Sequence, residues 1–170
     1  MLASLSLPST LRAPGGVLTL RRAQMEDVPA LMELLADDGL SASRGDGGRG
    51  HDPTPYRVAL QAIMEDPGND VILAEDPEGS AVATMQLTRT PGLARRGSTR
   101  LLVEAVRVDS GHRSAGIGSA MMHWVIETAA PALGASLVQL TSDASRAEAH
   151  RFYERLGFVG SHIGFKYRLS

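Results

Sequence analysis

The sequence of 170 residues contains no cysteine. Disulfide bonds, thiolate metal sites and a cysteine nucleophile are therefore excluded. The chain also lacks an excess of one charge, because its formal net charge is −2 and its isoelectric point is about 6.2, so no general attraction to nucleic acid is expected. No apolar run approaches the roughly 18 residues that span a bilayer. These absences favour a soluble, cytoplasmic protein with neither a nucleic-acid nor a membrane partner.

The composition that is present is typical of a globular chain. Hydrophobic residues make up 43% and charged residues 21% of the sequence, close to the averages for soluble domains. A domain of this size buries roughly 70% of the surface of its unfolded chain, which is enough for a full core. The N-terminus lacks the basic region of a signal peptide. We therefore expect a flexible leader over residues 1–16 and one domain over residues 17–170.

Apolar periodicity and turn residues predict an α/β order of elements. Strands are expected at residues 17–22, 70–74, 81–87, 100–109 and 137–140, with two short ones near residues 158–159 and 163–169. Helices are expected at residues 26–36, 56–64, 116–130 and 145–156. The turn residues Asp-Pro-Glu-Gly at 76–79 predict that the second and third strands form a hairpin.

Two stretches match motifs without the context that a site needs. Residues 45–50 match G-x-G-x-x-G, but they follow no predicted strand and open no helix, so a mobile loop is favoured over a dinucleotide site. The arginines at 89, 95, 96 and 100 form a local basic stretch, which is more simply a solvated loop than a nucleic-acid site. The five histidines show no metal-ligand spacing, so no metal site is expected.

The strongest motif lies at residues 106–119, where a predicted strand runs into a glycine-rich turn and then into an amphipathic helix. Glycines let backbone N–H groups close on a ligand, and the N-terminus of a helix adds a partial positive charge. Together they predict a phosphate site that needs no lysine. A plain strand–loop–helix connection with packing glycines is the alternative.

This segment and a second one resemble the GNAT N-acetyltransferases. Arg113-x-x-Gly116-x-Gly118 resembles the family's Q/R-x-x-G-x-G/A pyrophosphate loop, and residues 149–158 resemble its A-x-x-[LF]-Y-x-x-x-G-F signature. The resemblance covers roughly residues 17–169. It implies an α/β GNAT fold, with a central mixed twisted sheet of about six to seven strands, about four flanking helices and a splayed parallel strand pair.

The resemblance also implies that acetyl-CoA is the cosubstrate and that no metal takes part. The cofactor would lie between the strand that ends at Val108 and the strand at residues 137–140. The backbone of Val106, Arg107 and Val108 would pair with the pantetheine arm and hold the thioester carbonyl. The pyrophosphate would be bound by N–H groups of Arg113, Ser114, Ala115, Gly116, Ile117, Gly118 and Ser119.

Two side chains are candidates for catalysis. Tyr153 matches the family's usual general acid, whose hydroxyl points at the CoA sulfur; a core aromatic is the alternative, and Phe152 fits that alternative better. Glu104 is the one acid inside the apolar strand over residues 101–108, so we expect it to act as the base, directly or through water. The alternatives for Glu104 are a solvated edge position or a role in orienting substrate.

Three further features bear on the acceptor. Arg146 stands where the family often has asparagine, so the usual polar contact near the cofactor's thiol end is in doubt, while an arginine can reach a phosphate. The glycine-rich loop over residues 39–55 lies where the family covers its acceptor, and it is either a substrate lid or disordered. His162 either contacts the acceptor or lies in a turn.

The resemblance implies an acyltransferase that moves acetyl from acetyl-CoA to a primary amine of a small molecule, such as an amino sugar, a polyamine or an aminophosphonate. Without cysteine an acyl-cysteine intermediate is impossible, so a ternary complex is expected. A protein or peptide N-acetyltransferase and a non-catalytic acyl-CoA-binding regulatory module are the alternatives. Five of the seven aromatic residues lie between Phe152 and Tyr167, and this cluster permits a homodimer through C-terminal strands.

Overall fold

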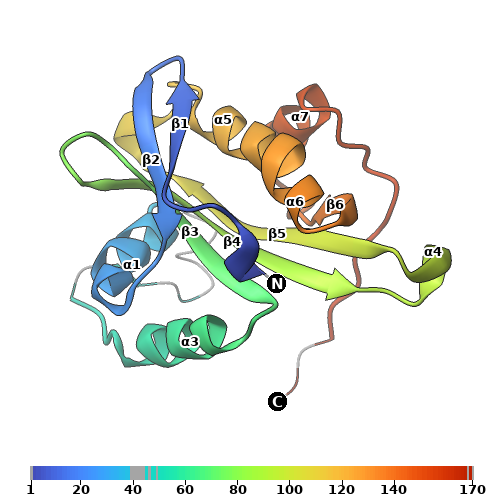
Figure 1. The fold of residues 1–170 in the computed structure, drawn as a ribbon. Helices are drawn as coiled ribbons and strands as arrows, with labels where there is room; N and C mark the ends of the chain where they lie inside the picture. Colours follow the sequence, from blue (N-terminus) through green and yellow to red (C-terminus); the bar gives the residue numbers. More distant parts are fainter. Residues whose placement is uncertain (1, 39–44, 46, 49, 168, 170) are drawn as a thin grey trace.

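The computed structural model describes residues 2–38, 45, 47–48, 50–167 and 169, which form one sheet flanked by helices (Figure 1). The strands are β1 (Ser9–Ala13), β2 (Gly16–Arg22), β3 (Asn69–Glu75), β4 (Ala81–Pro91), β5 (Thr99–Val108) and β6 (Ala135–Leu140). The longer helices are α1 (Val28–Ala36), α3 (Thr54–Glu65), α5 (Ile117–Trp124) and α7 (Ala147–Arg155). The shorter helical segments are η1 (Leu2–Ser4), η2 (Met25–Asp27), α4 (Ala94–Gly97), η3 (Ser110–His112), η4 (Val125–Ala129) and α6 (Ala130–Ala132).

The sheet is mixed, and its strands are ordered β1-β2-β3-β4-β5-β6. Neighbouring strands from β1 to β5 are antiparallel, whereas β5 and β6 are parallel. Helices α1 and α3 cover one face of the sheet and α5 covers the other, with a hydrophobic cluster on each side (Figure 1). The six-stranded sheet with its parallel pair confirms the fold class predicted from the sequence.

The helix predicted over residues 116–130 is interrupted by a π-helical segment. Regular α-helix ends at Trp124, Val125–Ala129 is π-helical, and one further turn follows at Ala130–Ala132. Pro131 lies in that last turn and has no backbone N–H to donate four residues back, so the regular ladder is broken just before it. None of the helices in the described part of the chain is long and apolar enough to cross a membrane.

The N-terminal residues differ from the expected flexible leader. Ser9–Ala13 pairs with β2 as an edge strand, and the side chains of Leu2, Leu5 and Leu11 are buried in the core. The guanidinium of Arg22 donates to the backbone oxygens of Leu2 and Leu5, at 2.8 and 3.2 Å. The sequence pattern missed this strand because β1 buries a single side chain, which leaves no alternation to detect.

The C-terminal residues also differ, because the two short strands expected near residues 158–159 and 163–169 are not formed. The described residues after Arg155 include no strand, and this segment extends away from α7 (Figure 1). The apolar side chains of Val159, Ile163, Phe165, Tyr167 and Leu169 are 81–93% exposed. The alternation of the last four is typical of a strand, but no described residue of this segment pairs with the sheet, although β6 is an edge strand.

An ion-pair network fixes the start of α1 against the sheet. Arg21 on β2 contacts Asp27, just before α1, and Glu75 on β3, each at 2.6 Å. Hydrogen bonding from Arg21 holds the pKa of Asp27 below its usual range, so this carboxylate stays charged. The helix then buries its apolar side against the sheet and ends at Ala36, followed directly by two aspartates.

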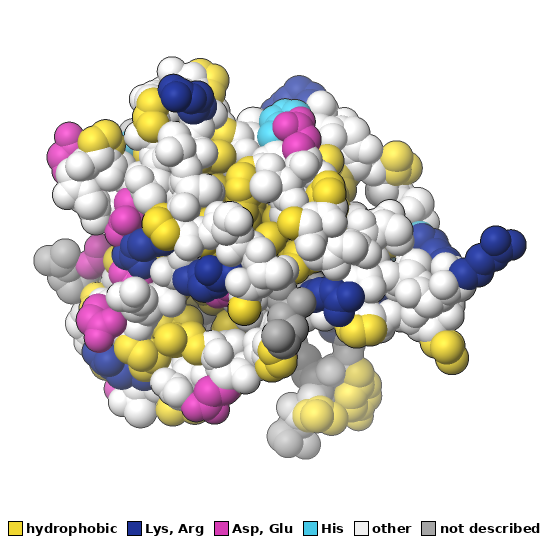
Figure 2. Space-filling model, viewed as in Figure 1, with side chains coloured by type: hydrophobic (Ala, Val, Ile, Leu, Met, Phe, Trp, Pro, Cys, Tyr) yellow, Lys and Arg dark blue, Asp and Glu magenta, His cyan; other side chains and the backbone are white. Residues whose placement is uncertain are grey.

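The turn between β1 and β2 packs against the glycine-rich turn before α5. The N–H of Gly15 donates to the oxygen of Ala115 at 2.9 Å, and a Cβ at Gly116 would lie 2.6 Å from Cδ of Pro14. Beside this turn, a hollow of about 530 Å³ lies between β1 and α5, lined by Leu11, Trp124 and others. Figure 2 shows apolar side chains along this part of the surface, with charged side chains scattered around it.

Gly116→Ala is expected to destabilise the fold, because Gly116 has φ +77° and no room for a Cβ beside Pro14. A left-handed backbone at a non-glycine residue costs about 1–3 kcal/mol. Gly118→Ala is the matched control, since its Cβ would meet Phe152 and Val108 at an ordinary 3.6 Å. Urea unfolding should show a lower free energy of unfolding for Gly116→Ala alone; equal losses in both variants would contradict the argument.

Candidate active site

The site begins where β5 and β6 part. Their parallel pairing ends at the Val103–Leu140 pair, while β5 stays paired with β4 as far as Val108. The register between β4 and β5 shifts at this point, and Ala105 adopts a positive φ of 49°. Residues 104–108 are therefore paired with β4 on one side and with no described strand on the other. We call this unpaired side of β5, beyond the end of β6, the opening; it is the splayed pair expected from the sequence.

The glycine-rich turn lies next to this opening. It runs from η3 to α5, and Ser114 and Gly116 have positive φ values of 66° and 77°. At the start of α5, a Cβ added at Gly118 would touch the side chains of Val108 and Phe152. The structure thus brings the two groups of cofactor-binding candidates, residues 106–108 and 113–119, to one place beside α7.

The carboxylate of Asp109 makes two short contacts at the start of this turn. The side chain of Asp109 accepts a hydrogen bond from the N–H of Gly111 and lies 2.9 Å from Nδ1 of His112. The contact with His112 is the main reason that the pKa of Asp109 lies below its usual range. The turn that follows β5 is therefore held in shape by the carboxylate of Asp109.

Two carbonyl groups expected to face the cofactor are engaged by arginines of this chain. Nη1 of Arg107 donates to the oxygen of Val106 at 2.8 Å, and Nε of Arg113 donates to the oxygen of Val108 at 3.3 Å. A ligand arm that paired with these oxygens would have to displace the arginine side chains.

Tyr153 lies on α7 and is half-buried. Its ring makes edge contacts with Phe152 and Phe158, with centroids 5.0 and 5.8 Å apart. Burial raises the pKa of the Tyr153 hydroxyl, and the charges of Arg107 and Arg146 oppose that shift in part. The hydroxyl is therefore protonated at neutral pH and is a proton donor rather than an acceptor.

Glu104 lies on β5, in register with Gln86 on β4. The sequence predicted apolar surroundings for this carboxylate, but its side chain is exposed. Alternation along β5 is the physical reason: Leu101 and Val103 face the core, so Glu104, the next residue, faces away from it. Glu104 is consequently accessible to water and to a soluble acceptor.

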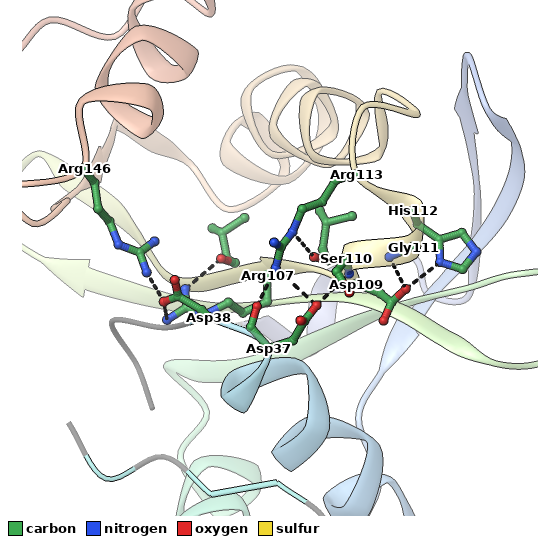
Figure 3. A network of polar contacts seen from close by, with 11 residues as sticks. Asp37, Asp38, Arg107, Asp109, Ser110, Gly111, His112, Arg113 and Arg146 are labelled. Carbon is green, nitrogen blue, oxygen red and sulfur yellow. Dashed lines mark hydrogen bonds and ion pairs between the residues drawn. The ribbon is translucent and has the colours of Figure 1, made fainter. Parts of the chain in front are cut away.

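The sequence interpretation missed an acidic pair that follows α1. Asp37 accepts hydrogen bonds from the N–H of Ser110 at 2.6 Å and from the Arg113 guanidinium at 3.2 Å, and its backbone oxygen also accepts from Arg113 (Figure 3). The C-terminal end of α1 is thereby joined to the glycine-rich turn.

Asp38 makes a second set of contacts with two other arginines. Nη2 of Arg146 donates to Oδ2 of Asp38, and Nη2 of Arg107 lies 3.6 Å from the same oxygen (Figure 3). Two acids directly after a helix are unfavourable to its dipole, which is a weak sequence signal for cations near Asp37 and Asp38 but does not identify the arginines.

Two other sequence candidates are placed away from this cluster or outside the described residues. His162 lies in the exposed C-terminal segment, where its ring contacts the hydroxyl of Ser161 at 2.7 Å. Much of the loop over residues 39–55 lies outside the described residues, and Gly47 within it donates to the hydroxyl of Tyr56. In the part of the chain that the structure describes, no group of three or more acidic or histidine side chains is placed to hold a metal.

Comparison with known proteins shows which family this chain is similar to. A model of the acetyltransferase (GNAT) family matches residues 29–158. The chain is 45% identical over 49 residues to an aminoalkylphosphonate N-acetyltransferase from Salmonella typhimurium; the match covers 29% of this chain and about a third (31%) of that relative.

Two solved structures share the fold over almost their whole length. A transcriptional regulator from Bacillus halodurans C-125 is 40% identical, with a TM-score of 0.81, over 89% of this chain and 99% of that one. Glucosamine-6-phosphate N-acetyltransferase from Arabidopsis thaliana is 17% identical, with a TM-score of 0.70, over 90% and 99%. Since the family model spans most of the chain, the protein belongs to the acetyltransferase (GNAT) family.

Proposed function

We propose that this acetyl-CoA-dependent acetyltransferase moves the acetyl group directly to a primary amine of a small molecule, in a ternary complex. The observation that carries the proposal is the convergence at Gly118, where the glycine-rich turn, the end of β5 and α7 meet beside the opening between β5 and β6. A pyrophosphate at the turn and a thioester at residues 106–108 would place the CoA sulfur near Tyr153.

The transfer forms a C–N bond and breaks a C–S bond. The neutral amine attacks the thioester carbonyl, and backbone N–H groups at residues 106–108 stabilise the oxyanion. Glu104, directly or through water, takes the proton that the amine nitrogen loses. Tyr153 gives its proton to the departing thiolate, whose pKa is about 8.5 when free, and regains one from solvent. The products are the acetamide and the CoA thiol.

Two observations favour a small-molecule acceptor. The part of the chain that matches the aminoalkylphosphonate N-acetyltransferase is 45% identical to it, and that relative is named for a small amine. In addition, the end of α1 approaches the site closely through Asp37 and Asp38, which narrows the space for a peptide. A protein or peptide acceptor is the alternative within the family. A regulatory acyl-CoA-binding module is the alternative outside catalysis, and the Bacillus halodurans protein is named as a transcriptional regulator.

The proposal is tested by acetyl-CoA-dependent thiol release over amino sugars, polyamines, aminophosphonates and short peptides. We expect turnover on a small amine and none on peptides. The Glu104→Gln variant should bind CoA normally in calorimetry and lose turnover by about 100-fold, the lower range for general base catalysis. Peptide turnover would support the protein-acetyltransferase alternative, and CoA binding without any turnover would support the regulatory one.

Tyr153→Phe should lower kcat by about 100-fold or more, because the thiolate then leaves without a proton. The active form of Tyr153 is the neutral phenol, and its pKa is raised above the ordinary value of 10.0. The wild-type rate should therefore persist through pH 10 and fall only above it. Tyr167→Phe, in the exposed C-terminal segment, is the matched control. An aryl thioester, whose thiol is more acidic, should reduce the loss; an equal loss would contradict the proton-donor role.

The homodimer through C-terminal residues stays a prediction, and the exposed apolar side chains of residues 159–169 support it. Removal of residues 159–170 should convert a dimer into a monomer in light scattering. As a control, Leu93→Ser removes another exposed apolar side chain, 98% accessible, at the far end of the β4–β5 hairpin. A full-length chain that is monomeric at all concentrations would refute the prediction.

A further inference from the structure

Two arginines from different elements converge on one carboxylate. Arg107 lies on β5 and Arg146 lies at the start of α7, and both guanidinium groups approach Oδ2 of Asp38 (Figure 3). The side chains are largely covered, with exposed fractions of 19% for Arg107, 29% for Arg146 and 22% for Asp38. This geometry, two guanidinium groups around an oxyanion, is the arrangement that proteins use to bind carboxylates and phosphates.

The contacts of this arginine pair with Asp38 are separate from the ionic contacts at the glycine-rich turn. There, the aspartate is Asp37, and its partners are Arg113 and the N–H of Ser110. The arginine pair lies instead beside the proposed proton donor, because the charges of both Arg107 and Arg146 act on Tyr153. The two aspartates therefore make two separate sets of contacts, Asp37 at the glycine-rich turn and Asp38 with the arginine pair.

We propose that Arg107 and Arg146 bind a phosphate or phosphonate group on the amine acceptor, and that Asp38 occupies this position when the acceptor is absent. The proposal rests on the function proposed above and narrows its substrate class. It favours phosphorylated amino sugars and aminophosphonates, and it disfavours polyamines, whose positive charges the arginine pair would repel.

The competition between Asp38 and such an acceptor follows from charge and position. Asp38 is a monoanion with two oxygens, placed just after the C-terminal end of α1, where the helix dipole disfavours it. A phosphate carries a charge of about −1.5 to −2 and three acceptor oxygens at neutral pH. Because Arg107 and Arg146 come from the two sides of the opening between β5 and β6, an anion held by both lies at the mouth of that opening.

The first experiment compares matched acceptors with and without the anionic group. Glucosamine 6-phosphate is paired with glucosamine, and 2-aminoethylphosphonate with ethanolamine. The ratio of kcat/KM values within each pair should be at least 10 to 100 in favour of the anionic amine. Turnover of glucosamine or ethanolamine at an equal rate would overturn this proposal while leaving the proposed acetyl transfer standing.

Variants of the arginine pair show where the preference arises. Arg146→Met should lower the ratio by about 10- to 100-fold, chiefly through the KM of the anionic acceptor, and Arg146→Lys should restore part of it. Arg151→Met is the matched control on the same helix, since Arg151 is 60% exposed and contacts Glu148. Asp38→Asn removes the internal competitor and should lower the KM of the anionic acceptor several-fold.

A phosphate of CoA itself is the other source of the same chemistry, and a second measurement separates the two. If the arginine pair served CoA, Arg146→Met would raise the KM of acetyl-CoA, and this rise would be smaller with acetyl-dephospho-CoA or acetyl-pantetheine; that result overturns the proposal.

Binding of methylphosphonate to the protein saturated with CoA gives a readout independent of turnover. Protection of the wild type against thermal unfolding, lost in Arg146→Met, supports the site even if the acetyl-transfer assay fails. Equal protection of both proteins, or protection of neither, contradicts it.

Discussion

The parting of β5 from β6 after the Val103–Leu140 pair is the constraint on which the rest of the site depends. If β5 and β6 stayed paired along their whole length, their backbone N–H and C=O groups would bond to each other and none would be left for a ligand. Here β4 continues to hold β5 while β6 ends, and the bulge at Ala105 turns the last residues of β5. The glycine-rich turn, α5 and α7 are all packed around that opening.

Electrostatic balance is the second organising feature. Arg107, Arg113 and Arg146 lie around the opening. Asp37 and Asp38, at the end of α1, form ion pairs with them. Because the start of α1 is tied to β2 and β3 through Arg21, the aspartates are carried on a helix that is anchored at its other end. The end of α1 is thereby joined by ion pairs to β5, the glycine-rich turn and the start of α7.

The sequence predicted the parts of the fold that carry a strong periodic or turn signal. The β3–β4 hairpin, β5, the glycine-rich turn and α7 lie close to their expected positions, because alternation, glycine and the apolar stripe of a helix are local properties. The edge strand β1 was missed, since Leu11 is its one buried side chain. The aspartates after α1 were missed because their partners, Arg107, Arg113 and Arg146, lie 69 to 108 residues further along the chain, and no local pattern reports such a contact.

The pairing of these arginines with internal aspartates has a consequence for selectivity among the anions of a cell. Inorganic phosphate, nucleotides and acidic metabolites are abundant, and an open cluster of three arginines would collect them. When each arginine is already paired with an aspartate, a stray anion gains only an exchange, in which one set of charge-assisted hydrogen bonds is lost for another. A ligand would displace the aspartates only by also gaining contacts elsewhere in the opening, so discrimination would depend on the whole molecule and not on its charged group alone.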